Sequence, residues 1–209
     1  MKVKVLRQQY PGATPYWEVF DYDGPQDISV AGMLDYLNYN DDIVNDKGEE
    51  TTRIGWECSC LQGICGACAM VINNVPALAC ETFLRNLKGK VVEIRPLRKF
   101  PVIKDLVIDR SSIQENLKKT NVYIENFKPS EDEDHAHQYA AAKCLKCGLC
   151  LEVCPNYVNG TPSMALHLRM TATWWRQEIL KNQARSGNST ENTLRRLVQS
   201  LYLVWMYVL

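Results

Sequence analysis

The cysteines of this chain constrain its fold more than any other feature of its 209 residues. There are nine of them, and eight fall into two sets with short gaps, one set ending at Cys80 and the other running from Cys144 to Cys154. Disulfides need an oxidising compartment, and the opening segment Met1–Val5 is not followed by the apolar stretch of a secretory signal. The cysteines are therefore expected to be metal ligands or buried free thiols, and their spacing decides between the two.

The first set has a spacing that is specific for one kind of centre. Cys60, Cys65 and Cys68 form C-x4-C-x2-C within the segment CLQGICGAC, and Cys80 follows at a distance. Three close thiolates and one distant one are typical of plant-type [2Fe–2S] ligation, whereas zinc sites more often use paired C-x2-C units. The spacing predicts that these four cysteines hold a [2Fe–2S] cluster.

Two glycines and a fifth cysteine accompany this loop. Gly63 and Gly66 allow the backbone to come close to a cluster and to direct N–H groups at its sulfurs. Cys58 lies two residues before Cys60 and is interpreted as a spare thiol, not a ligand.

The second set follows the bacterial ferredoxin pattern. Cys144, Cys147, Cys150 and Cys154 form C-x2-C-x2-C-x3-C, and Pro155 follows directly. In this pattern three cysteines bind one cubane and the fourth binds a different cluster. A single copy therefore needs a second cysteine run to supply the remaining ligands of both clusters, and no cysteine follows Cys154 as far as Leu209.

Hydrophobic patterning predicts an α+β chain. The first hundred residues are expected to form a small mixed sheet crossed by one helix that Ser29 caps. The second half is expected to be helical, and the run 131–134 to be a solvated acidic loop. The expected strands are Lys2–Gln8, Tyr16–Tyr22, Ala69–Asn73, Val75–Ala79 and Val91–Arg95, and a charged loop is expected at Asn40–Thr52. The helix capped by Ser29 carries Met33, Leu34, Tyr36 and Leu37 on one side. Further helices are expected at Ser111–Thr120, Gln138–Cys144, Leu149–Cys154 and Ser163–Gln183.

The charge balance and the hydropathy of the chain give no sign of a nucleic-acid-binding protein or of a membrane-spanning segment. Lys and Arg number 24 and so do Asp and Glu, which gives no electrostatic footprint for nucleic acid. No stretch reaches the roughly 20 apolar residues that span a bilayer, so an intracellular protein, soluble or peripheral on a membrane, is expected. His135 and His137 flank the acidic run and are interpreted as surface residues.

Over about residues 1–185 the chain resembles the iron–sulfur subunit of succinate dehydrogenase and fumarate reductase. Two different cluster motifs in this order are more specific than either alone. The matching stretches are Trp56–Cys60, Gly63–Met70, Asn73–Leu84, Phe100–Asp109 and Cys144–Pro155.

The resemblance implies a β-grasp [2Fe–2S] ferredoxin domain at residues 1–104 and an all-α ferredoxin domain at residues 105–209. It also implies an FAD-containing flavoprotein partner and a membrane anchor that binds quinone. The chain would then lie peripherally on the cytoplasmic side of the inner membrane and would bind no small-molecule substrate itself.

The resemblance further implies ligand sets for the second motif. Cys144, Cys147 and Cys150 would bind three irons of a [4Fe–4S] cluster, and Cys154 would be one ligand of a [3Fe–4S] cluster. The family continues to another cysteine run that completes both clusters, whereas Arg195–Leu209 has none. Two interpretations of this tail stay open, a truncated or frame-shifted end and a contact to a subunit or membrane surface.

A family member of this kind would relay electrons between FAD on its partner and quinone, with clusters and no acid, base or nucleophile of its own. One alternative is a defective or regulatory module with a single working cluster. Another is the iron–sulfur subunit of a different oxidoreductase. Some members carry a Trp just after the second motif that helps to form the quinone site, and here those positions are Asn156-Tyr157-Val158.

Overall fold

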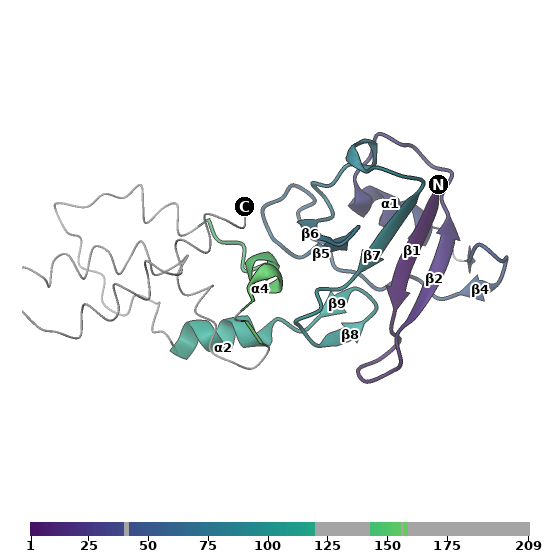
Figure 1. Ribbon diagram of the computed structural model, residues 1–209. Helices are drawn as coiled ribbons and strands as arrows, with labels where there is room; N and C mark the ends of the chain where they lie inside the picture. Colours follow the sequence, from purple (N-terminus) through teal and green to yellow (C-terminus); the bar gives the residue numbers. More distant parts are fainter. Residues whose placement is uncertain (40–41, 120–142, 156, 159–209) are drawn as a thin grey trace, which may run out of the picture. The chain divides into compact units, whose positions relative to one another are not determined.

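The computed structural model describes residues 1–39, 42–119, 143–155 and 157–158 (Figure 1). Apart from Lys143, all of these residues belong to one compact unit formed by Met1–Asn121 and Cys144–Ala165.

Five strands form a mixed sheet in the order β2-β1-β7-β5-β6 (Figure 1). β1 pairs antiparallel with β2 and parallel with β7, and β5 pairs antiparallel with both β7 and β6. This confirms the expected mixed sheet. The strands are β1 (Lys2–Arg7), β2 (Tyr16–Asp21), β5 (Ala69–Ile72), β6 (Val75–Leu78) and β7 (Val91–Arg95).

The side-chain pattern explains these strands. In β1 the residues Val3, Val5 and Arg7 are buried and alternate with partly exposed residues, as expected for a strand with one face in the core. The turn between β5 and β6 places Asn73 at φ +47° and Asn74 at φ +67°. Both positive values suit a two-residue type I′ hairpin turn, in which Asn is favoured.

The helix α1 (Val30–Asn38) begins as predicted at Ser29, whose Oγ accepts a hydrogen bond of 3.2 Å from the N–H of Gly32. Met33 and Leu34 are fully buried in the core. The prediction that Tyr36 shares this buried face is wrong, because its side chain is exposed. Its hydroxyl donates to Asp23 and its ring meets the edge of a neighbouring tyrosine.

The expected charged loop at 40–52 contains a short two-stranded ladder, β3 (Ile43–Val44) and β4 (Glu50–Thr51). A second short hairpin is formed by β8 (Val102–Lys104) and β9 (Val107–Ile108). Strands of two or three residues carry too little periodicity for a sequence pattern to reveal them. The other elements are η1 (Leu84–Asn86), α2 (Ser111–Lys119) and α4 (Leu149–Val153).

A buried ion network fastens the β8–β9 hairpin to the sheet. Arg7 is fully buried, and its Nη1 donates to Glu18 Oε2 at 2.6 Å, while its Nε lies 3.0 Å from Asp105 Oδ1. The Nε contact is an ion pair without the alignment of a hydrogen bond. Asp105 also accepts hydrogen bonds from the N–H groups of Gln8 and Gly55. Asp105 therefore holds the β8–β9 hairpin against the sheet, and the segment after β9 begins at this anchored hairpin.

The all-α second domain, residues 105–209, stays a prediction, since only α2, α4 and the segment around α4 are described. The predicted helix at 163–183, the acidic run, both histidines after it and the tail lie outside the described residues. The predicted helix at 138–144 also lies outside them, except for Lys143 and Cys144, which are not helical. In the described part of the chain, no helix is long and apolar enough to cross a membrane.

Candidate metal centre

The β5–β6 hairpin brings two cysteines of the first set together. Cys68 directly precedes β5, and Cys80 follows two residues after β6 ends at Leu78. The N–H of Ala79 donates to the carbonyl of Cys68 at 3.1 Å, and the sulfurs of Cys68 and Cys80 lie 3.4 Å apart. Both residues are buried, with 3% and 8% of their surface exposed.

The irregular loop before β5 supplies the other two cysteines. Backbone N–H groups of Gln62 and Ile64 donate to Cys60 Sγ at 3.3 and 3.4 Å, and the N–H of Ala67 donates to Cys65 Sγ at 3.5 Å. This confirms the prediction that the loop directs N–H groups at sulfur. The donors from Gln62 and Ile64 lower the pKa of the Cys60 thiol to about 7.

The two halves of the set interact. The Cys65 thiol hydrogen-bonds Cys60, and Cys80 interacts electrostatically with Cys60 and Cys68. Burial, followed by the hydrogen bond between the Cys80 and Cys68 sulfurs, raises the pKa of Cys80 to about 11, because both favour the protonated form. Metal binding must therefore displace a firmly held proton from the Cys80 thiol.

Three left-handed residues shape this loop, namely Leu61 at φ +54°, Gly63 at φ +72° and Gly66 at φ +78°. A Cβ on Gly63 would collide with the carboxyl group of Glu81, and a Cβ on Gly66 would lie 2.7 Å from the Cβ of Cys147. Gly66 therefore allows a second segment of chain to approach, which is a different role from the one that the sequence suggested.

These observations fit a [2Fe–2S] cluster. Four free thiols from a loop and a hairpin end converge, and backbone N–H groups point at their sulfurs. Among the described residues, no group of three or more His, Cys, Asp or Glu side chains is placed to hold a single metal ion. That finding is compatible with a two-iron centre, in which each iron takes two thiolates and two bridging sulfides.

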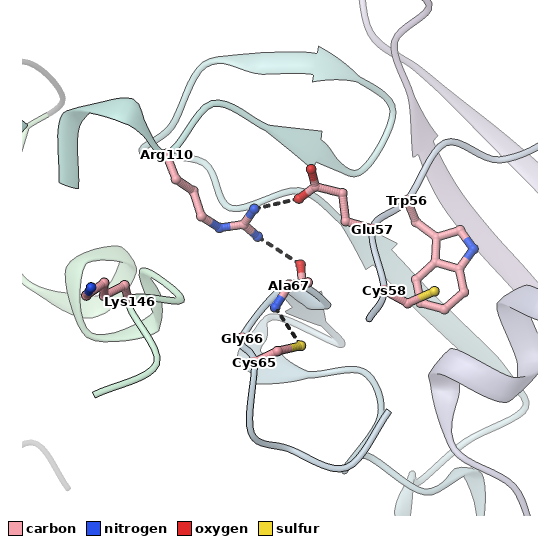
Figure 2. Close-up of a pocket in the computed structure, with 8 residues that line it drawn as sticks. All are labelled: Trp56, Glu57, Cys58, Cys65, Gly66, Ala67, Arg110 and Lys146. Carbon is pink, nitrogen blue, oxygen red and sulfur yellow. Dashed lines mark hydrogen bonds and ion pairs between the residues drawn. The ribbon is translucent and has the colours of Figure 1, made fainter. Parts of the chain in front are cut away.

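Cys58 stands apart from the four. It is exposed, and it lines an open pocket beside Trp56 and Glu57 (Figure 2). Partial desolvation of its thiol, together with the nearby Asp35 carboxylate, raises the pKa of Cys58 above its ordinary value. Its assignment as a spare thiol stays a prediction.

The second set lies on a loop and a short helix. Cys144 and Cys147 precede α4, Cys150 lies within it, and Cys154 is its C-terminal cap. All four are partly exposed. Pro155 follows the cap, as expected for a residue that ends a helix.

Basic residues after β7 hold α4 in place. Glu152, which is buried, accepts hydrogen bonds from Arg98 Nε at 3.0 Å and from the N–H of Lys99 at 3.1 Å. The Lys99 ammonium also donates to the carbonyl of Cys154. These residues were not predicted from the sequence, because nothing in the local pattern links Arg98 to a carboxylate more than fifty residues away.

Arg110 was also missed, and it lies between the two cysteine segments. Figure 2 shows its guanidinium reaching Glu57 and Ala67 in a pocket of about 490 Å³. The pocket is lined by Trp56, Glu57, Cys58, Cys65, Gly66, Ala67, Arg110 and Lys146.

Taken together, the mixed sheet and the four converging thiols define an iron–sulfur-binding protein of the ferredoxin type. The family model for the 2Fe-2S iron-sulfur cluster binding domain matches residues 2–115, and the chain belongs to this family.

Known proteins share this similarity over most of the chain. A succinate dehydrogenase iron–sulfur subunit from Bacillus subtilis is 35% identical over 160 residues, covering 73% of this chain and 62% of that protein. A fumarate reductase iron–sulfur subunit from Haemophilus influenzae is 35% identical over 176 residues, covering 75% of this chain and 65% of that protein. The chain thus spans a little under two thirds of these relatives.

Among solved structures, one chain of the Mycobacterium smegmatis Sdh1 complex in the apo form aligns with a TM-score of 0.57 at 27% identity. The alignment covers 73% of this chain and 62% of that one.

Proposed function

We propose that this chain is the electron-transfer iron–sulfur subunit of a succinate dehydrogenase or fumarate reductase complex. It relays electrons between FAD on a flavoprotein subunit and quinone in a membrane. The observation that carries the proposal is the convergence of Cys60, Cys65, Cys68 and Cys80 within a domain of the 2Fe-2S family. The names of the relatives supply the type of complex.

In this proposal Cys60, Cys65, Cys68 and Cys80 hold the [2Fe–2S] cluster, which supplies one-electron chemistry when bound. The protein contributes the thiolates and the N–H groups of the loop. It also excludes water from Cys68 and Cys80, which lie in the core. The chain has no part in proton transfer and binds no dicarboxylate, so it is a non-catalytic subunit of the oxidoreductase.

The second set extends the electron path. Cys144, Cys147 and Cys150 would hold a [4Fe–4S] cluster, and Cys154 would be a ligand of a [3Fe–4S] cluster. The remaining ligands of both clusters would be residues other than these four. Supporting this, Cys147 lies against Gly66 in the loop of the first set, so the two cysteine segments are neighbours.

The proposed partners are an FAD-containing flavoprotein and a membrane anchor with bound quinone. The complex would place this chain peripherally on the cytoplasmic side of the inner membrane. Two apolar side chains on the first cysteine loop support a protein partner there, since Leu61 is 47% exposed and Ile64 is 67% exposed.

The ligand assignment is tested with Cys80→Ser, using Cys58→Ala as the matched cysteine control. Iron and acid-labile sulfide are measured in the purified full chain. We expect Cys80→Ser to lose about two irons and two sulfides per chain relative to the parent protein, and Cys58→Ala to lose none. Full iron content in Cys80→Ser, or loss of iron in Cys58→Ala, would contradict the assignment.

A further inference from the structure

Arg110 contacts both cysteine segments at once. It lies between β9 and α2, and its Nη2 donates to the carbonyl of Ala67 at 3.0 Å, while its Nε donates to the carbonyl of Cys147 at 3.3 Å. Ala67 lies between two predicted ligands of the first set, and Cys147 belongs to the second set. One planar side chain therefore joins the two loops by hydrogen bonds with fixed relative directions.

The position of the guanidinium is itself fixed. Its Nη1 donates to Glu57 Oε2 at 2.6 Å, and its side chain is 20% exposed. Arg110 also follows the β8–β9 hairpin, which Asp105 fastens to the buried Arg7. The cation is thus held in a partly buried place beside the first cysteine loop, paired with the Glu57 carboxylate. Its removal would leave that negative charge uncompensated next to the loop.

The loops that Arg110 joins are in direct contact. Gly66 has φ +78°, and a Cβ there would lie 2.7 Å from Cys147 Cβ and 3.1 Å from Leu145 Cβ. No other residue type fits this contact without displacing one of the two segments. The contact needs to be held, because Cys147 stands in an irregular segment outside the helix α4.

We propose that Arg110 is a positioning residue shared by the two cysteine segments, and that its charge raises the reduction potential of the [2Fe–2S] cluster. This inference rests on the proposed function. Reduction adds one electron, and no proton, to a centre that already carries the charge of four thiolates. A nearby cation stabilises the more negative reduced form, and a fixed cation does so without reorganising.

The test is a redox titration of the full chain with its clusters, monitored by paramagnetic resonance, in three variants. We expect Arg110→Gln to lower the midpoint potential of the [2Fe–2S] cluster. Arg110→Lys, which keeps the charge but loses the planar fork, lowers it by less. Arg98→Gln is the matched control, because Arg98 holds α4 through Glu152 and, within the described part of the chain, makes no hydrogen bond to the first loop. We expect the midpoint potential of this variant to stay at the parent value.

An Arg110→Gln protein with intact cluster content and the parent midpoint overturns the inference. If Arg110→Gln does not retain the cluster, the Lys variant decides, and a parent midpoint there overturns the inference equally. A shift in Arg98→Gln as large as that in Arg110→Gln also overturns it, because loosening of α4 would then suffice. Failure of the proposed function looks different, since the parent protein would then show no [2Fe–2S] signal to titrate.

Discussion

Individual residues place a charge or a close interatomic contact in the interior of this domain. Arg7 is the clearest case, since it is fully buried and touches carboxylates from two different segments, Glu18 and Asp105. Burying a charge is tolerated only when partners compensate for the lost hydration. Asp105 therefore contributes to stability chiefly by keeping Arg7 paired.

We expect Asp105→Asn to lower the free energy of unfolding by about 3 kcal/mol, because it leaves Arg7 buried with one fewer counter-charge. Asn tolerates the left-handed backbone of this position, φ +48°, so the backbone is not a second cause. Urea denaturation measures the effect. The control is Asp27→Asn, which breaks an exposed pair with Arg85 and should change stability by no more than about 0.5 kcal/mol. Equal losses in the two variants would contradict the role given to Asp105.

Substitution of Gly66 should also lower the stability of the domain. Gly66→Ala should destabilise the chain by more than the roughly 1 kcal/mol that a left-handed alanine costs, because its Cβ must push Cys147 away. Gly12→Ala is the matched control, since Gly12 has φ +83° and open space around it.

The measurement for this pair is amide hydrogen exchange of residues 144–154, with urea unfolding alongside. Faster exchange of that segment is expected in Gly66→Ala alone. Identical exchange and identical loss of stability in the two glycine variants would show that the two cysteine segments do not depend on this contact.

Among the elements, α1 shows how a local signal fixes a boundary. Ser29 precedes the helix and accepts from the N–H of Gly32, which satisfies one of the free donors at the helix start. Met33 and Leu34 then lie one turn along, in the core under the sheet. The cap and the buried face agree, which is why this helix could be predicted from sequence.

We expect Ser29→Ala to lower the free energy of unfolding by about 1 kcal/mol, since the N–H of Gly32 loses its acceptor. Ser29→Thr, which keeps a hydroxyl, should restore most of that loss. Chemical denaturation followed by circular dichroism reports both variants. A Thr variant as unstable as the Ala variant would mean that the hydroxyl is not what stabilises the start of α1.

The strands and the cysteine loop were predictable for the same kind of reason. Alternation along β1, the Asn73-Asn74 turn and the spacing of Cys60, Cys65 and Cys68 are all local patterns. The short ladders β3–β4 and β8–β9 were missed, because strands of two or three residues have no detectable period. Tyr36 was placed on the wrong face, because its ring and hydroxyl find partners at the rim of the core.

For the molecule as a whole, the contacts that join distant segments were the part that sequence could not supply. Arg110 reaches Glu57 and Cys147, and Arg98 reaches Glu152, across separations that no spacing rule covers. The predicted cluster ligands can be recognised in the sequence because they are cysteines at characteristic spacings. The residues that hold the two cysteine loops together are ordinary charged side chains. Their role becomes visible only once the fold brings the loops into contact.

Paramagnetic resonance of the full chain shows whether the first cysteine set holds a one-electron [2Fe–2S] centre. Purified anaerobically, the chain should show a signal that appears on reduction with dithionite and disappears on reoxidation. That signal should survive in Cys147→Ser and be lost in Cys80→Ser. A parent chain with no reducible signal, or a signal that Cys147→Ser removes and Cys80→Ser leaves intact, would contradict the account.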